Sequence, residues 1–185
     1  MKLFNVVRRQ VGWVRRHPIA GRTPLASLAR VWGRQLRTHL GGGRSTVPFV
    51  GATRLVIGPG RSTANACYDG GLSAPVEMAA VVHLLRSGEL FVDIGANLGV
   101  FTILAAGVAG ARVVAIEPAP ETLPNLRAHV LLNGLEAKVE VAATALSDAP
   151  GTIRMTAGLG ASNRVDATGI AVPVTTLDAL LAGRQ

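Results

Sequence analysis

The sequence predicts an α/β fold in which a parallel sheet follows a basic helical extension. Between residues 90 and 143, three short apolar runs alternate with two segments of helical periodicity, an order typical of parallel strands joined by right-handed crossovers. A glycine-rich loop follows the first run, at the place where open α/β sheets bind ligands. The chain has 185 residues, of which 49% are hydrophobic, so we expect one domain with an ordinary core.

The basic residues are concentrated near the N-terminus. Residues 1–68 hold 12 of the 19 lysines and arginines and no acidic residue. Residues 69–185 combine the other 7 basic residues with all 11 acidic ones, which leaves a net charge of −4. This part is mildly acidic, which argues against nucleic-acid binding by the molecule as a whole.

Residues 1–43 are expected to form a basic amphipathic helical extension that ends in a glycine linker at 41–43. Apolar residues recur at helical spacing within residues 3–14, and again at Leu25, Leu28, Trp32 and Leu36. Two interpretations of residues 1–40 are open. The helices contact an anionic membrane surface or a nucleic acid, or they are a packing extension with solvated arginines; we favour the packing extension.

Residues 44–88 are expected to lead into the core. The patterns at 54–57 and 63–68 predict two short strands around the Gly-Pro-Gly turn at 58–60. A helix is predicted from residue 75 to about residue 86, because Pro75 is typical of a first helical position and Ser-Gly follows its end.

Residues 89–185 carry the alternating strands and helices of an α/β domain. After the first strand come a helix, a second strand, a second helix that ends at Asn-Gly, and a third strand. A hairpin and a short last helix follow; the helix opens with Thr-Thr-Leu-Asp, similar to a capping box. The predicted ranges, in order, are 90–94, 100–108, 112–116, 120–133 and 138–143, then 152–155, 170–174 and a helix after 175–178.

Several classes of protein are excluded by simple counts. The single cysteine, Cys67, cannot form an internal disulfide and is expected to be a small buried residue. No cluster of residues has convincing metal-ligand spacing. The longest apolar run, residues 100–111, is too short to cross a bilayer, and arginines interrupt every candidate signal-peptide core. We therefore expect a cytoplasmic protein.

The glycine-rich loop is the most informative segment. The strand at 90–94 delivers Asp93 at its carboxyl end, and Gly95 and Gly99 let the backbone turn tightly next to a ligand. The spacing Gly-x-Asn-x-Gly differs from the Gly-x-Gly-x-x-Gly of dinucleotide folds. The Asp93 carboxylate would repel a pyrophosphate, but it suits a ligand with an ammonium or sulfonium charge. S-adenosylmethionine (SAM) carries both.

A second acidic residue supports a nucleoside ligand. Glu117 directly follows the second strand and lies 22 positions beyond Gly95. A carboxylate at this place accepts hydrogen bonds from ribose hydroxyls in nucleotide-binding sheets. Asp93 and Glu117 together therefore predict a nucleoside site. The alternative, in which both are only caps and surface carboxylates, remains open.

These motifs, in their serial order, resemble those of the FkbM-type SAM-dependent methyltransferases over roughly residues 50–180. The matching segments are Asp93–Gly99, Ala115–Pro118, Leu126–Gly134, Ala145–Asp148 with Gly151, and Val172–Asp178. The resemblance implies a Rossmann-like class I methyltransferase sheet with SAM as cofactor. It also implies methyl transfer to a hydroxyl of a sugar or a related small molecule. With the acidic charge of residues 69–185, we expect a small-molecule methyl acceptor and no nucleic acid as partner.

Carried over residue by residue, the resemblance implies a cofactor-binding set. Asp93, Gly95, Ala96, Asn97 and Gly99 would form the loop beside the methionine end of SAM. Glu117 would bind the ribose, Pro118 would belong to the same cofactor-binding set, and the segment 143–146, which includes Ala145, would lie beside the adenine. The resemblance does not indicate a catalytic base in this chain, and His83 and His129 are expected to have surface or packing roles within helices.

One departure from the family pattern concerns the end of the sequence. In the family, the segment that matches residues 172–178 is followed by a further strand with a Lys-Ile-Asp-x-Glu-Gly-type motif. We therefore expect only the N-terminal, cofactor-binding half of the fold, an open sheet edge prone to self-association, and a chain that is no working enzyme alone. Two other function classes remain open: a non-catalytic nucleoside-binding module with an anionic-surface-binding arm, and a nicotinamide-dependent oxidoreductase, which the glycine spacing disfavours.

Overall fold

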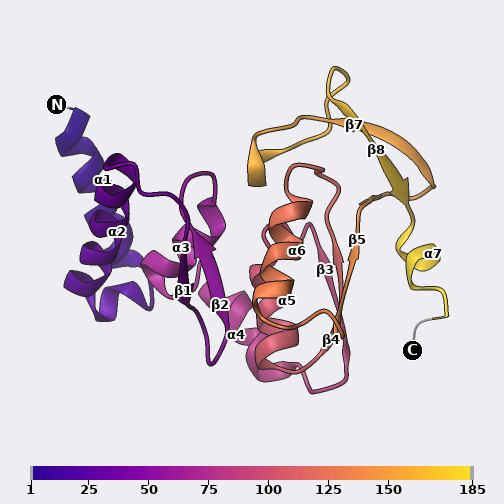
Figure 1. Cartoon of the computed structure of the whole chain (residues 1–185), viewed down its shortest axis with the longest axis horizontal. Helices are drawn as coiled ribbons and strands as arrows, with labels where there is room; N and C mark the ends of the chain where they lie inside the picture. The colour runs from indigo at the N-terminus through magenta and orange to yellow at the C-terminus, as the bar shows by residue number, and fades with distance from the viewer. Residues whose placement is uncertain (1, 184–185) are drawn as a thin grey trace.

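The computed structural model describes residues 2–183. A pair of N-terminal helices lies at one end of the molecule, and a three-stranded sheet covered by helices lies toward the other end (Figure 1). A second small sheet crosses above the first, near the carboxyl ends of its strands. The α/β class is confirmed, because β3, β4 and β5 form a parallel sheet in that order.

The two predicted N-terminal helices are confirmed. They are α1 (Lys2–Arg16) and α2 (Pro24–His39), joined by a 3-10 turn at Ala20–Arg22. Pro24 occupies the first turn of α2, where its missing N–H leaves no bond unmade. Val14 of α1 and Val31 of α2 are both buried, and the two helices pack against each other.

The apolar residues that repeat along α2 lie mostly on an exposed face of the helix. Leu25, Trp32 and Leu36 are exposed, with 82%, 44% and 59% of their surface accessible. The buried positions are Ser27 and Val31, on the opposite side of the helix. The reason is that Ser27 faces the turn at Ala20, whose carbonyl accepts its hydroxyl at 3.3 Å, so polar contacts decide which side faces inward.

A hairpin and a helix occupy the segment that leads into the core. β1 (Ser45–Pro48) and β2 (Arg54–Ile57) pair antiparallel, and α3 (Ser62–Gly70) follows. The strand predicted at 63–68 is therefore wrong, because this stretch is helical. Ala64 and Cys67, one turn apart, are both buried, and the Asn65 amide bonds both the N–H and the carbonyl of Gly58 at 2.9 Å, which locks the start of the helix.

The strands and helices predicted for the central sheet are confirmed with small shifts at the ends. Leu90 pairs with Arg112, and Val113 with Val139, so all three strands start at one edge. The second half of the first helix widens into a π-helix, in which the Ala109 N–H reaches the Leu104 carbonyl at 3.0 Å. The elements are α4 (Pro75–Leu84), β3 (Leu90–Ile94), α5 (Val100–Ile103) with its π-helical extension (Leu104–Val108), β4 (Arg112–Ile116), α6 (Leu123–Leu132) and β5 (Val139–Ala142).

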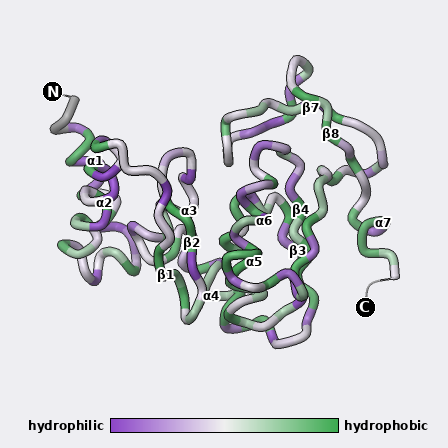
Figure 2. Tube along the Cα trace, in the orientation of Figure 1, coloured by the Kyte–Doolittle hydropathy of each residue, from purple (hydrophilic) through white to green (hydrophobic). Residues whose placement is uncertain are grey.

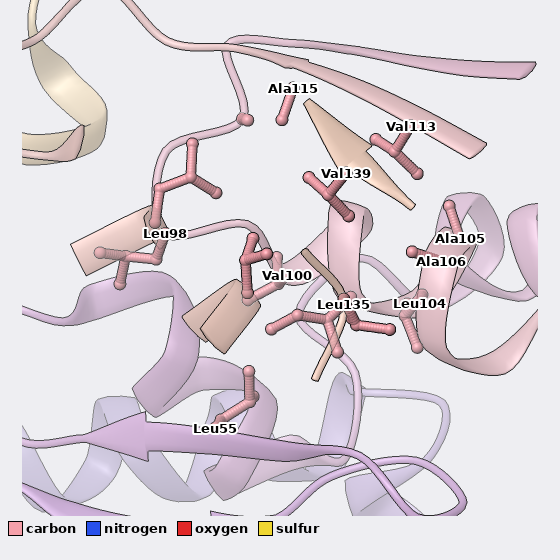
Figure 3. Packing of buried hydrophobic residues seen from close by; sticks show 14 of the residues in the cluster. Leu55, Leu98, Val100, Leu104, Ala105, Ala106, Val113, Ala115, Leu135 and Val139 are labelled. Atoms are coloured by element: carbon pink, nitrogen blue, oxygen red, sulfur yellow. The ribbon is translucent and has the colours of Figure 1, made fainter. Parts of the chain in front are cut away.

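One continuous core joins the hairpin to the sheet. Leu55 of β2 packs in the same cluster as Leu104 of the π-helical segment and Val113 of β4 (Figure 3). Apolar residues are most concentrated along α5 and β4 (Figure 2). Cys67 belongs to this cluster and is 1% exposed, as predicted for a small buried residue, and burial raises the pKa of its thiol. The division of the chain at residues 43 and 88 remains a prediction.

The C-terminal hairpin is confirmed and belongs to a second sheet. β7 (Gly151–Met155) pairs antiparallel with β8 (Ile170–Thr175), and the short β6 (Ala145–Leu146) pairs parallel with β8 on its other side. A 3-10 turn, Gly160–Ser162, lies in the hairpin loop. The last helix, α7 (Leu177–Leu181), is capped by the Thr176 hydroxyl, which accepts the Ala179 N–H at 3.1 Å. The predicted cap therefore shifts by one residue.

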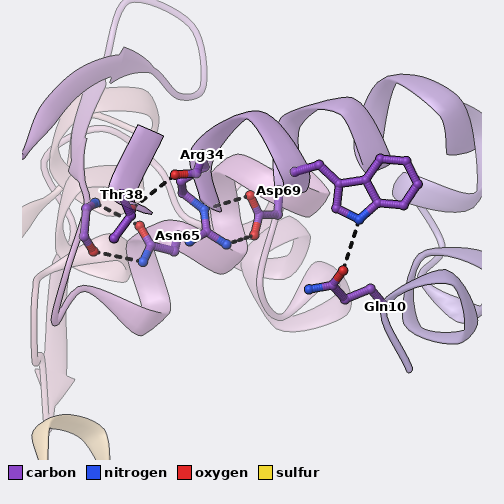
Figure 4. A network of polar contacts seen from close by, with 7 residues as sticks. Gln10, Arg34, Thr38, Asn65 and Asp69 are labelled. Atoms are coloured by element: carbon purple, nitrogen blue, oxygen red, sulfur yellow. Dashed lines mark hydrogen bonds and ion pairs between the residues drawn. The ribbon is translucent and has the colours of Figure 1, made fainter. Parts of the chain in front are cut away.

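Polar contacts attach the N-terminal helices to the rest. Arg34 of α2 forms a two-pronged ion pair with the buried Asp69 of α3 (Figure 4). The buried His17 donates from Nε2 to the Leu72 carbonyl at 2.8 Å and accepts the Ala20 N–H at Nδ1 at 3.2 Å. The N-terminal helices therefore pack against α3 and the residues that follow it. Within residues 2–183, no helix is long and apolar enough to cross a membrane.

The ion pair on α3 makes a testable prediction. Asp69→Asn removes the charge that holds Arg34 in a partly buried place. We expect faster amide hydrogen exchange across α1 and α2 and a loss of about 1–3 kcal/mol in the free energy of unfolding. Asp148→Asn, at an exposed carboxylate bonded only to Ser147 among the described residues, is the control. Equal exchange in both variants would contradict this role for Asp69.

Candidate functional site

The loop after β3 is tied to the end of the neighbouring strand. The N–H groups of Gly95 and Ala96 both donate to the Ile116 carbonyl, each at 2.9 Å. Ile116 is the last residue of β4 and pairs with Ile94. The loop therefore leaves β3 sideways across the carboxyl end of β4, which is the edge where parallel sheets present ligand-binding residues.

Three loop residues have left-handed backbone conformations. Gly95 has φ +75°, Gly99 has φ +81°, and Asn97, with φ +51°, is the non-glycine residue of this kind among residues 2–183. A Cβ on Gly99 would lie 2.5 Å from Cδ1 of Leu126, so glycine is required there for the close approach of α6. A Cβ on Gly95 would meet no atom within 4 Å, so the space in front of Gly95 is open.

Asp93 is buried behind this loop. Its side chain is 8% exposed, and Oδ2 accepts the Thr102 hydroxyl at 2.5 Å. This bond joins the end of β3 to α5. Burial raises the pKa of the Asp93 carboxyl; the Thr102 bond opposes that rise, and the charge of Glu117 adds to it. The two predicted acidic residues therefore lie close enough to interact.

Glu117 connects the loop to the chain after β4. Its Oε2 accepts the Asn97 N–H at 2.8 Å, and its Oε1 accepts the Ala119 N–H at 2.9 Å. The side chain is 7% exposed. Hydrogen bonds to a charged acceptor are stronger than neutral ones, so this carboxylate holds Asn97 in its left-handed conformation. Each carboxylate oxygen accepts one of these bonds and keeps a second lone pair.

The other two predicted residues lie on the far side of Glu117. Pro118 is half-buried and directly precedes Ala119, which packs with Met155 and Val172. Ala145, in β6, packs against the same small cluster. The structure thus brings Asp93, the loop residues 95–99 and Glu117 together, and it connects Ala145 to them through Ala119.

The family comparison matches this region. The Methyltransferase FkbM domain matches residues 93–185, which is half of the chain and begins at Asp93. The chain belongs to the FkbM methyltransferase family. Its α/β architecture, with the parallel order β3-β4-β5, is a class I methyltransferase-like fold. A comparison with curated proteins gives no match.

Several solved structures are similar to this FkbM-family chain at low identity. Pyrococcus horikoshii TYW2 in complex with MeSAdo matches with a TM-score of 0.45 and 19% identity, over 58% of this chain and 38% of its own. A SAM-dependent methyltransferase from Agrobacterium tumefaciens has a TM-score of 0.43 and 19% identity, over 55% and 32%. The M. jannaschii tRNA m1G37 methyltransferase has a TM-score of 0.39 and 20% identity, over 58% and 36%. The chain thus spans 32% to 38% of these three structures.

A buried histidine supports the glycine loop from the side of α6. His129 is fully buried; its Nε2 accepts the Val56 N–H at 2.8 Å, so its Nδ1 carries the proton and donates to the Leu98 carbonyl at 2.7 Å. Burial lowers the pKa of His129, and the charge of Arg61 lowers it further. The predicted packing role is confirmed, and His83 is exposed on α4 as expected for a surface residue.

Sequence reasoning missed several residues that hold the site together. Thr102 and the Ile116 carbonyl have no motif of their own. Arg61, at the start of α3, is 3% exposed and donates to Oδ1 of Asn125 at 2.6 Å, which links α3 to α6. The position of Thr102, nine residues after Asp93, was the available signal, since it places the hydroxyl in the first turn of the following helix.

The candidate loop is open on the side of Gly95, where an added Cβ would meet no atom within 4 Å. A surface hollow of about 410 Å³ lies among α1, α2 and α3, lined by residues that include Trp13, Arg34 and Asp69. The two carboxylates mark the candidate site at the end of β3. Among the described residues, no three His, Cys, Asp or Glu side chains gather into a potential metal site.

The buried histidine predicts a pH dependence of stability. The pKa of His129 is lower in the folded chain than the ordinary value of 6.5, so the unfolded chain binds this proton more readily. The free energy of unfolding is therefore expected to decrease as pH falls below about 6.5. His129→Gln should remove this slope and, through lost buried hydrogen bonds, about 1–3 kcal/mol of stability at neutral pH.

Urea unfolding measured from about pH 7.5 to about pH 5.5 checks this prediction. His83→Gln is the matched control, because His83 is exposed and its removal should leave the slope unchanged. A slope that persists in His129→Gln and disappears in His83→Gln would refute the assignment.

Proposed function

We propose that this chain binds SAM at the edge where β3 and β4 end, and that the protein transfers its methyl group to a hydroxyl of a sugar or another small metabolite. The observation that carries the proposal is the pair of buried carboxylates, Asp93 and Glu117, joined through one left-handed glycine loop. Membership of the FkbM family supports the reaction class.

The residues present fit SAM better than they fit a pyrophosphate-containing cofactor. Two carboxylates beside the loop favour a cationic ligand and repel phosphate groups. The open space in front of Gly95 leaves the backbone accessible to a ligand. Gly95, Ala96, Asn97 and Gly99 would hold the methionine end of the cofactor, with Asp93 near its positive charge.

The ribose and adenine would lie toward β4 and β6. Both oxygens of Glu117 already accept one backbone N–H each, which fixes the carboxylate in one orientation with further lone pairs available to a diol. Pro118 and Ala145 would then border the adenine side. This arrangement assigns a role to every residue predicted from the sequence.

SAM supplies a methyl group attached to a positively charged sulfur. The chain's task is to hold that group in line with the acceptor oxygen, which is mainly a matter of orientation. Proton removal from the acceptor is not assigned to His17 or His129, because both ring nitrogens of each are occupied by backbone hydrogen bonds. The general base is therefore a group other than these two histidines.

A small-molecule acceptor is proposed in preference to a nucleic acid. The part of the chain that holds the candidate site, residues 69–185, carries a net charge of −4, and phosphate backbones bind to positively charged surfaces. The resemblance to FkbM methyltransferases implies the same class of acceptor. A panel of sugars and polyketide alcohols, assayed beside tRNA, tests this part of the proposal.

The ribose contact is tested with the variant Glu117→Gln. Loss of a charge-assisted hydrogen bond should weaken S-adenosylhomocysteine binding about tenfold or more in calorimetry. Because Glu117 also holds the loop, a lower affinity alone would not show a ribose contact. The informative measurement is the preference for a ligand with both ribose hydroxyls. The wild-type chain should prefer S-adenosylhomocysteine to its 2′-deoxy analogue, and Glu117→Gln should bind both equally.

Glu136→Gln, at an exposed acidic residue before β5, is the control and should keep the preference. The same titration with NAD tests the competing cofactor. NAD binding equal to or tighter than that of S-adenosylhomocysteine would overturn the proposed cofactor. A ribose preference that survives in Glu117→Gln would overturn the proposed ribose contact.

A further inference from the structure

An apolar stripe runs along the outer side of α2. Leu25, Trp32, Leu36 and the helix-capping residue Leu40 are 82%, 44%, 59% and 78% exposed. Their spacings of seven, four and four residues keep them on one side of a helix with 3.6 residues per turn. We call these four residues the α2 stripe. Exposed apolar surface of this length on a helix marks an interaction site.

The stripe cannot be part of the protein's own core as it is folded. Ser27, Val31 and Arg34 lie on the opposite side of α2. Ser27 and Val31 are buried, and Arg34 attaches the helix to α3 through Asp69. The two N-terminal helices lie at the end of the molecule far from the β3–β4–β5 sheet (Figure 1). The stripe is thus an outer surface that stays accessible while the core is intact.

The two helices of the N-terminal pair also carry exposed basic side chains. Residues 1–68 contain 12 lysines and arginines and no acidic residue. Most of the arginines of this helical pair are exposed; the exposed ones are Arg8, Arg9, Arg15, Arg16, Arg22 and Arg37. The first carboxylate in the sequence, Asp69, is buried against Arg34. A partner for this surface must therefore be both apolar and anionic.

Trp32 adds a feature typical of a lipid interface. Its indole N–H donates to the Gln10 side chain of α1 at 3.0 Å, as the dashed line to Gln10 in Figure 4 marks. The bond holds the ring at the junction of the two helices while 44% of the residue remains accessible. Tryptophan is enriched at the headgroup level of membranes because it is amphipathic.

We propose that α1 and α2 dock on the surface of an anionic lipid bilayer, with α2 lying in the plane of the membrane. The α2 stripe would insert between headgroups, and the arginines would contact anionic lipid phosphates, with their apolar stems along the interface. Charge complementarity and the exposed apolar stripe together argue for this partner. The inference does not depend on the cofactor proposed for the β3 edge.

Vesicle flotation with the full chain tests the proposal. The chain should float with phosphatidylcholine vesicles that contain phosphatidylglycerol, and not with phosphatidylcholine alone. Binding should fall steeply as salt rises from about 0.05 M to about 0.5 M, because salt screens surface charges. The double substitution Leu36→Gln/Leu40→Gln should weaken binding by about tenfold or more, since less apolar surface enters the interface.

A matched pair of leucines provides the control. Leu84 on α4 and Leu131 on α6 are 77% and 66% exposed and lie outside the α2 stripe. Leu84→Gln/Leu131→Gln should therefore keep full vesicle binding. Circular dichroism checks that both double variants fold. If Leu36→Gln/Leu40→Gln disturbs the helix, the single variant Leu25→Gln replaces it, and a smaller loss of vesicle binding is expected.

Three results would overturn the proposal. Equal loss in both double variants would mean that the position of the leucines does not matter. A second contrary result is salt-sensitive vesicle binding that Leu36→Gln/Leu40→Gln leaves unchanged and that tRNA displaces. It would mean that the arginines of α1 and α2 bind polyanions in general and that the apolar stripe does not contribute. A dimer in light scattering that the stripe variant dissociates, without vesicle binding, would mean that a second copy of the chain covers the stripe.

Discussion

The candidate site depends on the bridge that Glu117 makes between two segments of backbone. Its two oxygens hold the N–H groups of Asn97 and Ala119, so one carboxylate fixes both the glycine loop and the connection that leads from β4 to α6. Asn97 stays in a left-handed conformation that non-glycine residues rarely adopt. The Ile116 carbonyl, which accepts the N–H groups of Gly95 and Ala96, holds the start of the loop in addition to this bridge.

Two further hydrogen bonds hold the loop in addition to the Glu117 bridge. The Thr102 hydroxyl donates to Asp93 at the end of β3, and His129 donates to the Leu98 carbonyl within the loop. His129 also accepts a hydrogen bond from the N–H of Val56 in β2, so the hairpin before the sheet contributes to the position of the loop. The segment before the sheet is therefore part of the support of the site, and Leu55 shares the core with Val113 for the same reason.

The N-terminal helices show a different balance of forces. Polar contacts of Arg34 and His17 attach them to the body, while leucines that would ordinarily be buried face outward. Contact with another apolar medium, such as the bilayer interface proposed above, would remove the free-energy cost of leaving these leucines in water. The charge is divided in the same way: residues 1–68 are basic, and residues 69–185, which hold the candidate site, carry a net charge of −4.

The sequence by itself determined the elements whose pattern is local. The strands at 90–94 and 112–116 and the parallel order of the sheet follow from apolar runs that alternate with helices, and the pairing of Asp93 with a glycine loop and Glu117 follows from spacing. Only the tertiary structure decided the contacts between distant residues. The helix at 62–70 forms in place of a strand because Ala64 and Cys67 find a core one turn apart. The side of α2 that faces inward is chosen by Arg34 and Asp69, which are 35 positions apart. Hydrogen bonds and burial between such partners leave no periodic signal along the chain, and this is why neither could be read from the sequence.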